Sequence, residues 1–385
     1  MTAPLLPNHP PTSAYVHVPF CRHRCGYCNF TLVAGRDDLI DSYLDALERE
    51  IEQIGGTFEL QTLYLGGGTP THLPPAALTR LFSLLRHRFT LASGAEITVE
   101  ANPLDLDADR CAVLRDQGVN RISLGAQSFN DTKLQSLERD HRRLDVQRAL
   151  DAARDTVASV SLDLIYGAPG ETLPEWIDDV DRAIAAGVEH VSVYGLTIEQ
   201  GAAFYGRWLR GSLVKTGESL EAEMYEAAID RLAAAGLAQY EVSNFAQPGH
   251  RSRHNETYWR GRSYFAFGPG AASYVHGRRN MNHRSTTAYI QRMQQARSPV
   301  VETEELSPEE RARERLVFGL RMLEGVETEE FQRETGFEIT SLVGRQLEPL
   351  FEHGLLARSG QRLHLTRAGL LVSDAIWPKF LNAHE

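Results

Sequence analysis

The alternation of short apolar segments with amphipathic stretches constrains the fold of this chain more than any other feature. Segments rich in β-branched and aliphatic residues predict strands at 14–18, 62–65, 96–100, 121–124, 159–165 and 190–194. Apolar residues recur at helical spacing in the stretches 40–54, 75–86, 107–117, 145–156 and 174–186. Strand–helix alternation over this length predicts a parallel sheet with right-handed crossovers.

Six such units predict an α/β fold of the partial (β/α)6 TIM-like barrel type, because a closed barrel needs eight units. The pattern alone leaves a flat, doubly wound sheet open as the alternative. In barrels the carboxyl ends of the strands build the active site. Those ends carry the run 66–70 (Gly-Gly-Gly-Thr-Pro), Glu100 and Gln127 after the second, third and fourth strands. We therefore expect a ligand site on this face.

Four regions follow from the composition. The proline-rich residues 1–13 predict a disordered tail, 14–235 the partial barrel, 236–304 a barrel extension, and 305–385 a smaller C-terminal domain. A strand is expected at 240–245, and the Gly-, His- and Arg-rich stretch 249–274 reads as a functional loop. Helices and a hairpin at 356–365 give the C-terminal domain a winged-helix-like pattern.

Charge and hydropathy limit the partners and the location. Winged helices often bind DNA, but the formal net charge of −11 disfavours a nucleic-acid partner. No apolar run approaches the roughly 20 residues that cross a bilayer. The first residues lack the basic and apolar regions of a signal peptide, so a cytoplasmic protein is expected.

Three of the four cysteines are clustered with the spacing C-x3-C-x2-C at Cys21, Cys25 and Cys28. A disulfide within so tight a group would leave an odd thiol and a strained loop, so the cluster predicts a metal site. Three thiolates suit three irons of a cubane iron–sulfur cluster and leave the fourth iron open. A zinc site completed by His17 or His23 is the alternative, although zinc ligands usually come in pairs.

The fourth cysteine, Cys111, is set apart from this cluster. It falls in the helical pattern 107–117 and is expected to be a small buried apolar residue.

The cysteine motif after a first strand resembles the signature of the radical S-adenosylmethionine (SAM) superfamily. The resemblance implies a 4Fe-4S cluster whose open iron chelates the amino nitrogen and carboxylate of SAM. The segments 15–21, 66–70, 124–129 and 163–169 resemble the oxygen-independent coproporphyrinogen oxidase family. Carried over position by position, that resemblance assigns SAM contacts to Tyr15, Gly67, Gly68, Thr69, Glu100, Gln127, Arg139 and Asp163.

The residue types agree with these roles, although each has an ordinary alternative. Glycines let the backbone approach a ligand closely, or they serve a tight turn. Glu100 and Asp163 would accept hydrogen bonds from amino or ribose groups, or cap a helix. Arg139 would pair the methionine carboxylate, or be a solvated helix charge. Tyr27, inside the cysteine loop, would pack on adenine or in the core.

Two features distinguish members of this family. The oxidases have a fourth cysteine where this chain has Phe30, and they carry a longer segment ahead of the first strand. Residues 254–259 fit the pattern H-N-x-x-Y-W, which is typical of HemW-type heme chaperones. By that resemblance His254 would handle heme as an axial ligand. Tyr258 and Trp259 would supply a flat apolar surface for the porphyrin. The heme propionates would pair with Arg251, Arg253 and Arg260. The alternative is an ordinary hydrogen-bonded histidine.

The resemblance therefore predicts a heme chaperone that carries a 4Fe-4S cluster with SAM. Its expected partners are heme, a heme-acceptor protein, an electron donor for the cluster, and a membrane contacted peripherally through the acceptor. The alternative is an oxygen-independent coproporphyrinogen III oxidase, which decarboxylates propionates by radical chemistry. A radical enzyme acting on an unrelated substrate is a third reading.

Overall fold

The structure, a computed structural model, describes residues 10–381. Most of the predicted tail lies outside these residues, and the part inside them is ordered: Pro11 is buried and the first strand already begins at Ser13. Six strands follow one another in the sheet in chain order with parallel pairing. They are β1 (Ser13–Val18), β4 (Phe58–Gly67), β5 (Phe89–Ala101), β6 (Arg121–Gln127), β7 (Ser159–Tyr166) and β8 (His190–Gly195).

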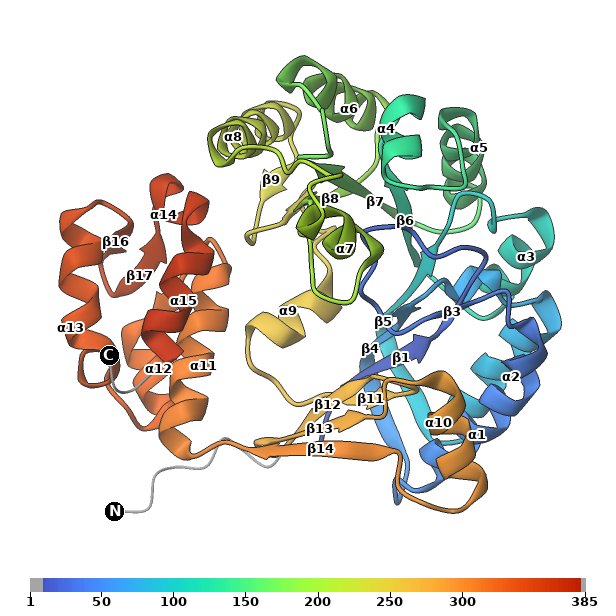
Figure 1. Cartoon of the computed structure of the whole chain (residues 1–385). Coiled ribbons are helices and arrows are strands. Elements are labelled where there is room, and N and C mark those ends of the chain that lie inside the picture. The colour runs from blue at the N-terminus through green and yellow to red at the C-terminus, as the bar shows by residue number, and fades with distance from the viewer. Residues whose placement is uncertain (1–9, 382–385) are drawn as a thin grey trace.

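The sheet is curled, and the helices that connect its strands cover its outer side (Figure 1). These helices are α1 (Ile40–Glu52), α2 (Pro75–Arg86), α3 (Ala108–Asp116), α5 (Arg143–Arg154) and α6 (Leu173–Ala185). The predicted partial barrel is confirmed, and the flat sheet with helices on both faces is not what forms. Cys111 is buried in α3, as expected.

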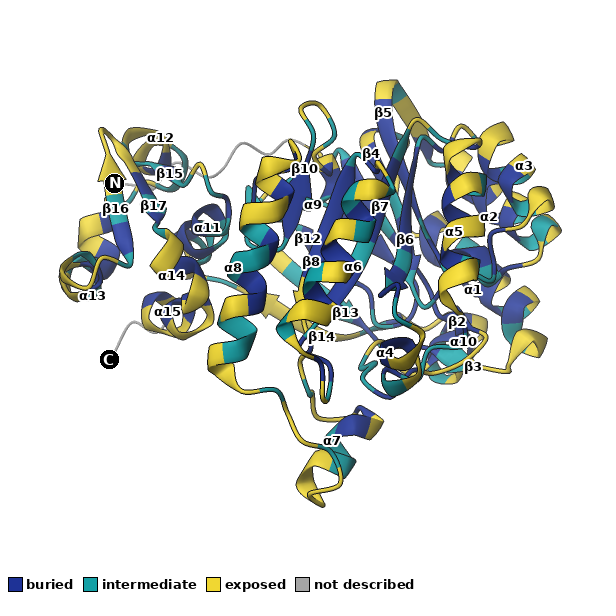
Figure 2. Ribbon diagram, turned by 90° about the horizontal axis from the view of Figure 1, so that it is seen from above, coloured by how far each residue is buried: buried dark blue, intermediate teal, exposed yellow. Residues whose placement is uncertain are grey.

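Local sequence explains where the helices begin. Asp107 caps α3 by accepting a hydrogen bond from the backbone N–H of Arg110. Thr172 and Glu175 form a capping box around Pro174 at the start of α6. The helices are also amphipathic. Figure 2 shows buried residues along the sides of the helices that face the sheet and exposed residues on their outer sides.

The sheet is wider than the six predicted strands. β11 (Phe265–Phe267) pairs parallel with β1, and β10 (Asn244–Ala246) pairs antiparallel with β8 and with β9 (Ala238–Gln239). The single strand expected at 240–245 is therefore wrong. The chain turns between β9 and β10 because Glu241 accepts hydrogen bonds from the backbone N–H of Ser243 and the side chain of Asn244.

The stretch 249–274 is not a loop. It contains α9 (Arg253–Trp259), β11 and the start of β12 (Ala272–Val275). β12 continues into a small antiparallel sheet with β13 (Arg278–Asn282) and β14 (Val300–Glu305), and α10 (Thr286–Gln294) connects the last two strands. His254 and Arg253 in this stretch bond to Thr62 and Gly94 of the barrel, a structural role that composition does not distinguish from that of a functional loop.

The C-terminal domain has its own apolar core, which includes Leu316, Phe331 and Leu363. Its elements are α11 (Pro308–Arg321), β15 (Val326–Glu327), α12 (Thr328–Thr335), α13 (Ile339–Glu352), β16 (Leu356–Ser359), β17 (Arg362–Leu365), α14 (Arg367–Leu371) and α15 (Ser373–Leu381). The hairpin β16–β17 lies where the sequence predicts it. Arg367 joins the domain to α8 (Glu218–Ala234) by an ion pair with Asp230.

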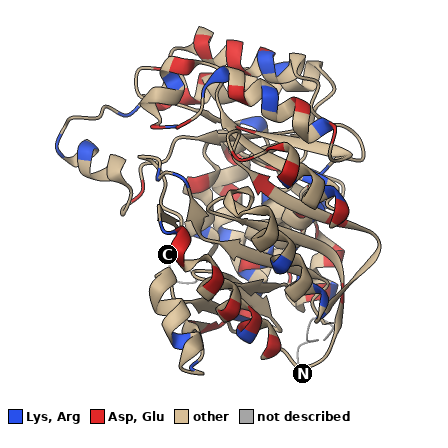
Figure 3. Ribbon diagram, turned by 90° about the vertical axis from the view of Figure 1, so that its right-hand side faces the viewer, with Lys and Arg blue, Asp and Glu red and all other residues tan. Residues whose placement is uncertain are grey.

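The surface carries mixed charge. On the face that Figure 3 shows, basic and acidic residues are interspersed along the helices. No helix within the described part of the chain is long and apolar enough to span a bilayer.

Short elements complete the barrel domain. They include β2 (Phe20–Cys21), β3 (Val33–Ala34) and α4 (Asp131–Ser136). The helix α7 (Ala203–Leu209) lies apart from the outer helices, against the cysteine loop (Figure 2).

Candidate functional site

A cavity of about 770 Å³ lies at the carboxyl ends of the parallel strands. Strand register brings its walls together: Val18 pairs with Gly67, Glu100 with Ser123, and Asp163 with Ser192. Eleven of the thirteen predicted site residues line it: Cys21, Cys25, Tyr27, Cys28, Gly67, Gly68, Thr69, Glu100, Gln127, Arg139 and Asp163. The structure does not bring Tyr15 or His254 to this wall.

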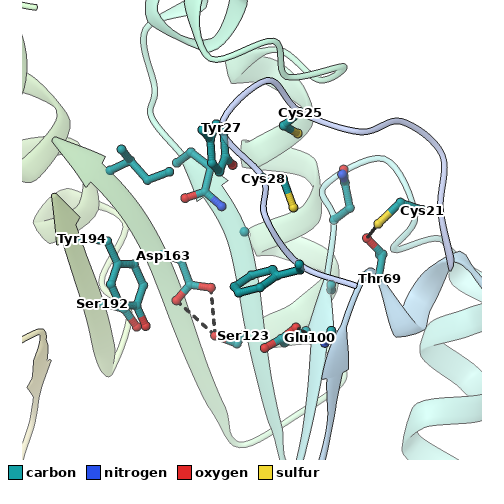
Figure 4. Close-up of a pocket in the computed structure, with 18 of the residues that line it drawn as sticks. Cys21, Cys25, Tyr27, Cys28, Thr69, Glu100, Ser123, Asp163, Ser192 and Tyr194 are labelled. Carbon is teal, nitrogen blue, oxygen red and sulfur yellow. Dashed lines mark hydrogen bonds between the residues drawn. The ribbon is translucent and has the colours of Figure 1, made fainter. Parts of the chain in front are cut away.

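The three thiols lie around one end of the cavity (Figure 4). Cys21 ends β2, and the loop beyond it carries the other two. Cys21 and Cys25 are each 8% exposed, whereas Cys28 is partly exposed. The backbone N–H of Cys28 donates to the Cys25 carbonyl at 3.1 Å, and the N–H of Phe204 donates to Gly26 at 2.8 Å. The loop is therefore held by its own turn and by α7.

Burial and neighbouring groups set the protonation of the thiols. Burial raises the pKa of Cys21 to about 12. A hydrogen bond with Thr69 Oγ1 at 3.3 Å acts in the opposite direction and lowers this pKa by a smaller amount. Burial also raises the pKa of Cys28. Arg139 Nη1 donates to Cys25 Sγ at 3.4 Å. Burial thus favours the protonated form of the Cys21 and Cys28 thiols in the absence of a metal, and metal ligation, which requires the thiolate, must displace those protons.

The arrangement suits a polynuclear cluster better than a single ion. Among the described residues, no three His, Cys, Asp or Glu side chains converge closely enough to hold one metal ion. In a cubane cluster each thiolate binds a different iron, so the thiols need only surround a common volume. Of the two histidines considered for a zinc site, His17 is already engaged, because its Nε2 is bonded to the Thr31 carbonyl at 2.6 Å and its Nδ1 to Tyr15 at 3.0 Å.

The glycines line the cavity, but their lack of a side chain serves the packing of the protein itself. Gly67 has φ +111°, and a Cβ there would lie 2.6 Å from the His17 ring. A Cβ on Gly68 would lie 2.8 Å from the Phe20 carbonyl oxygen. Both glycines are therefore required for the turn after β4 to pass beside the strands that lead to Cys21.

Two half-buried carboxyl groups occupy the cavity floor (Figure 4). Glu100 accepts hydrogen bonds from Tyr64 Oη at 2.8 Å and the Gly67 N–H at 2.9 Å, and Asp163 accepts from Ser123 at 3.1 Å. Burial raises the pKa of Glu100 to about 7 and that of Asp163 to about 6. Neither caps a helix, so both are placed to accept hydrogen bonds from a ligand.

Arg139 is not a solvated helix charge. Its Nη2 donates to the Gly125 carbonyl at 2.8 Å, and its Nε is buried without a partner among the described residues. Gln127 takes φ +66° at the end of β6, a conformation that non-glycine residues adopt mainly where surrounding structure enforces it. Tyr27 packs against Phe204 with ring centroids 6.4 Å apart. An orphaned guanidinium donor beside the thiols fits an anionic ligand group.

His254 lies behind the cavity rather than in it. Its side chain is 1% exposed, and its two ring nitrogens are hydrogen-bonded to Thr62 Oγ1 and Tyr258 Oη, each at 2.8 Å. Burial lowers the pKa of His254 to about 3. In this arrangement neither nitrogen is available to an iron, so the structure favours the ordinary hydrogen-bonded histidine.

The rest of the H-N-x-x-Y-W motif joins the barrel to the C-terminal domain, with α9 lying between them (Figure 1). Trp259 packs on Phe318, and the Arg321 guanidinium lies 4.3 Å from its ring centroid. The three arginines predicted to pair propionates already have partners: Arg253 donates to the Gly94 carbonyl, Arg260 pairs with Glu324, and Arg251 lies within 3.6 Å of Glu256.

The cavity is also lined by two residues that the sequence patterns did not single out, Tyr194 and Arg284, and by His23, which they indicated only as a zinc ligand. Arg284 Nη2 donates to the Asn29 carbonyl at 3.1 Å across 255 positions of sequence. Tyr194 was readable as a strand-end residue of β8, whereas nothing near Arg284 in the sequence signals its contact with the cysteine loop.

Known proteins are similar to this chain. The family model described as the Radical SAM superfamily matches residues 15–183, and that of the HemN C-terminal domain matches residues 306–372. The chain is 38% identical to "Heme chaperone HemW" of Bacillus subtilis, covering 96% of this chain and 99% of that one. It is 34% identical to the protein of the same name from Escherichia coli, covering 97% and 98%.

A mouse relative, "Radical S-adenosyl methionine domain-containing protein 1, mitochondrial", is 32% identical over 94% of this chain and 85% of its own. Among solved structures, the coproporphyrinogen III oxidase HemN of E. coli superposes with a TM-score of 0.85 over 97% of this chain and 91% of that one, at 24% identity. That likeness shows a shared fold.

A curled parallel sheet whose strand ends surround three thiols, together with the family match over residues 15–183, defines a radical SAM protein. Within this class the chain belongs to the HemW family, as its full-length identity to those proteins shows.

Proposed function

We propose that this protein is a heme chaperone: it binds heme and passes it to an acceptor protein. The observation that carries the proposal is the near full-length similarity to heme chaperones from several bacteria, at 34–38% identity. Phe30 supports it, because the oxidases that share the fold have a cysteine there. Further proposed partners are the acceptor, an electron donor for the cluster and, through the acceptor, a membrane surface. The proposed location is the cytoplasm.

We further propose that Cys21, Cys25 and Cys28 hold a 4Fe-4S cluster with SAM beside it. When bound, the cluster supplies an electron and an open iron for the methionine moiety of SAM. Arg139 pairs the SAM carboxylate with its unpartnered Nε. Glu100 and Asp163 accept hydrogen bonds from amino or hydroxyl groups.

The remaining wall residues, Tyr27, Gly67, Gly68, Thr69 and Gln127, shape the cavity around the nucleoside. Tyr15 receives no ligand role, since its hydroxyl bonds His17 and its ring stacks on Tyr64.

The second function, oxidative decarboxylation of coproporphyrinogen III, is favoured by one observation, the superposition on HemN. Because a shared fold hosts different chemistries, this likeness carries less weight than full-length family membership.

Anaerobic titration of the cluster-reconstituted protein with hemin tests the leading proposal. We expect a Soret band displaced from that of free hemin and saturating near one hemin per chain. Spectra identical to free hemin throughout the titration would overturn it.

A further inference from the structure

Several inward-facing positions of the barrel carry small hydroxyl residues where barrels usually carry bulky branched side chains. Thr98, Ser123, Ser161 and Ser192 line the cavity from the consecutive strands β5, β6, β7 and β8. Strand register sets these positions side by side, because Thr98 pairs with Arg121 and Ser123 pairs with Ser161. The cavity therefore continues past the cofactor carboxyl groups into a hollow with polar walls.

Arg121, the first residue of β6, brings an unpaired positive charge to this hollow. It lines the cavity and is only 4% exposed. Its Nη1 donates to the Ser159 hydroxyl at 3.2 Å and to the His250 carbonyl at 2.9 Å. Its Nη2 is buried and has no partner in the described part of the chain, where no carboxylate forms an ion pair with it either. Because a buried charge is costly unless it is paired, this guanidinium favours an anionic ligand.

Two titratable groups of the cavity respond to the charge of Arg121. Burial, and after it this charge, lowers the pKa of His190 well below its usual value, so the imidazole is neutral. The ring nitrogens of His190 are bonded to Ser161 Oγ at 2.7 Å and Tyr240 Oη at 3.0 Å. Burial raises the pKa of Asp163, and hydrogen bonds with serines and the charge of Arg121 act against this rise. Arg121, His190 and Asp163 thus face one part of the cavity.

A second donor without a partner lies next to Arg121. Thr98 is 1% exposed, and its Oγ1 makes no hydrogen bond with any described residue. Thr98 and Arg121 are paired in the register of β5 and β6, and both line the cavity. Two adjacent buried donors, one of them charged, match the two oxygens of a carboxylate.

This pair of donors is separate from Arg139, which lies beside the thiols. Arg139 donates to the carbonyl of Gly125, four residues after Arg121 in β6. Four residues of an extended strand span about 13 Å. The cavity therefore holds one guanidinium with an unpartnered donor at each of two well-separated places, and the proposed SAM carboxylate occupies only the one at Arg139.

We propose that the cavity has a second ligand subsite, in which Arg121 and Thr98 bind a carboxylate group. Arg121 Nη2 and Thr98 Oγ1 donate to the carboxylate oxygens, and the bound anion neutralises the buried guanidinium. The ligand lies in the barrel alongside SAM. A heme propionate and a free short-chain carboxylate offer the same chemistry, and only the heme source rests on the proposed function.

The first test is calorimetric titration of the full-length, cluster-reconstituted protein with propionate, with SAM present to occupy Arg139. Neutral propionamide at the same ionic strength is the matched probe. We expect propionate alone to bind, and Arg121→Gln to weaken its binding at least about 10-fold. The control is Arg148→Gln, whose side chain is 79% exposed on α5 and which should bind propionate like the unchanged protein. Iron content, measured in parallel, shows whether each variant keeps its cluster.

A second titration tests whether the carboxylate belongs to heme. Hemin is compared with its dimethyl ester, in which both propionates are neutral. If a heme propionate occupies the subsite, hemin binds at least about 10-fold more tightly than the ester, and Arg121→Gln removes that difference. If hemin stays free while propionate binds through Arg121, the heme-chaperone function falls and the subsite stands.

Thr98→Val carries both tests if Arg121→Gln fails to fold, because valine keeps the shape of threonine and removes only the hydroxyl. Its control is Thr286→Val at the start of α10, a buried threonine whose Oγ1 is also unpartnered among the described residues but which does not line this cavity. We expect weaker binding for Thr98→Val alone.

The subsite is overturned if the unchanged protein neither binds propionate nor distinguishes hemin from its ester. It is equally overturned if folded Arg121→Gln binds both probes as the unchanged protein does, or if Thr98→Val does so where it is the only variant that folds.

Discussion

The imidazole of His254 and the phenol ring of Tyr64 are stacked, with ring centroids 5.0 Å apart and planes inclined by 28°. Tyr64 in turn donates its hydroxyl to Glu100 on the cavity floor. His254 therefore supports the cofactor cavity from behind, through Tyr64. The motif that suggests a heme ligand in the sequence acts in the structure as a support for the cavity wall.

His254→Ala should destabilise the protein. The change removes two buried hydrogen bonds and leaves a void, which together cost about 2–4 kcal/mol. Urea denaturation of the cluster-free protein measures the free energy of unfolding, with His87→Ala as the exposed control expected within about 0.5 kcal/mol of the unchanged protein. Unchanged stability together with complete loss of hemin binding would instead support a ligand role for His254.

Cys25→Ala should abolish the iron–sulfur cluster. Reconstitution of the unchanged protein is expected to give about four iron atoms per chain, and the variant little or none, because one of three anchoring thiolates is missing. Cys111→Ala is the control and should retain iron, since that thiol is buried in α3, apart from the cavity. Stoichiometric zinc without iron in the unchanged protein would refute the cluster.

Gly68→Ala should lower cluster occupancy. A Cβ there would lie 2.8 Å from the Phe20 carbonyl oxygen, so the strand that ends at Cys21 must shift. Iron content and iron-to-sulfide ratio after reconstitution measure the effect. Gly344→Ala has open space around its Cβ and should leave iron unchanged. Equal iron in both variants would show that the turn tolerates displacement.

Stability of the cluster-free protein should depend on Glu100 between pH 4.5 and 7. Because burial raises the pKa of Glu100 from 4.5 to about 7, the folded state holds a proton that the unfolded state has lost. Stability from this group is therefore present below pH 4.5 and is lost as pH rises toward 7.

In the unchanged protein the free energy of unfolding falls as pH rises, and Glu100→Gln should reduce this fall by up to about 3 kcal/mol. Urea denaturation at pH 5 and pH 8 measures it, with the exposed Glu223→Gln as control. A fall of the same size in both variants would show that Glu100 does not hold the proton.

Sequence periodicity predicted the barrel because each of its six strands is an apolar run bounded by helical patterns. It did not predict β11, whose three residues gain their strand conformation from pairing with β1 at a distance of some 250 positions. It also merged β9 and β10, because the turn between them depends on Glu241, a buried side chain whose hydrogen bonds no local pattern reveals.

The site was predictable where its residues lie in the carboxyl-terminal halves of the parallel strands, as Glu100 and Asp163 do. It was not predictable where tertiary packing decides. The same imidazole chemistry suits a heme ligand or a buried hydrogen-bonded residue, and only the surroundings of His254 separate them. Arg284 contacts the cysteine loop from the segment between β13 and α10, 255 positions away from Asn29, so no spacing could have indicated it.

The central claim, a heme chaperone rather than an oxidase, is tested most directly by anaerobic incubation of the cluster-reconstituted protein with coproporphyrinogen III, SAM and a reductant. A portion of the same sample is titrated with hemin. We predict that the porphyrinogen keeps all its propionates while the hemin sample reaches about one heme per chain. Formation of protoporphyrinogen, with hemin remaining free, would contradict the claim.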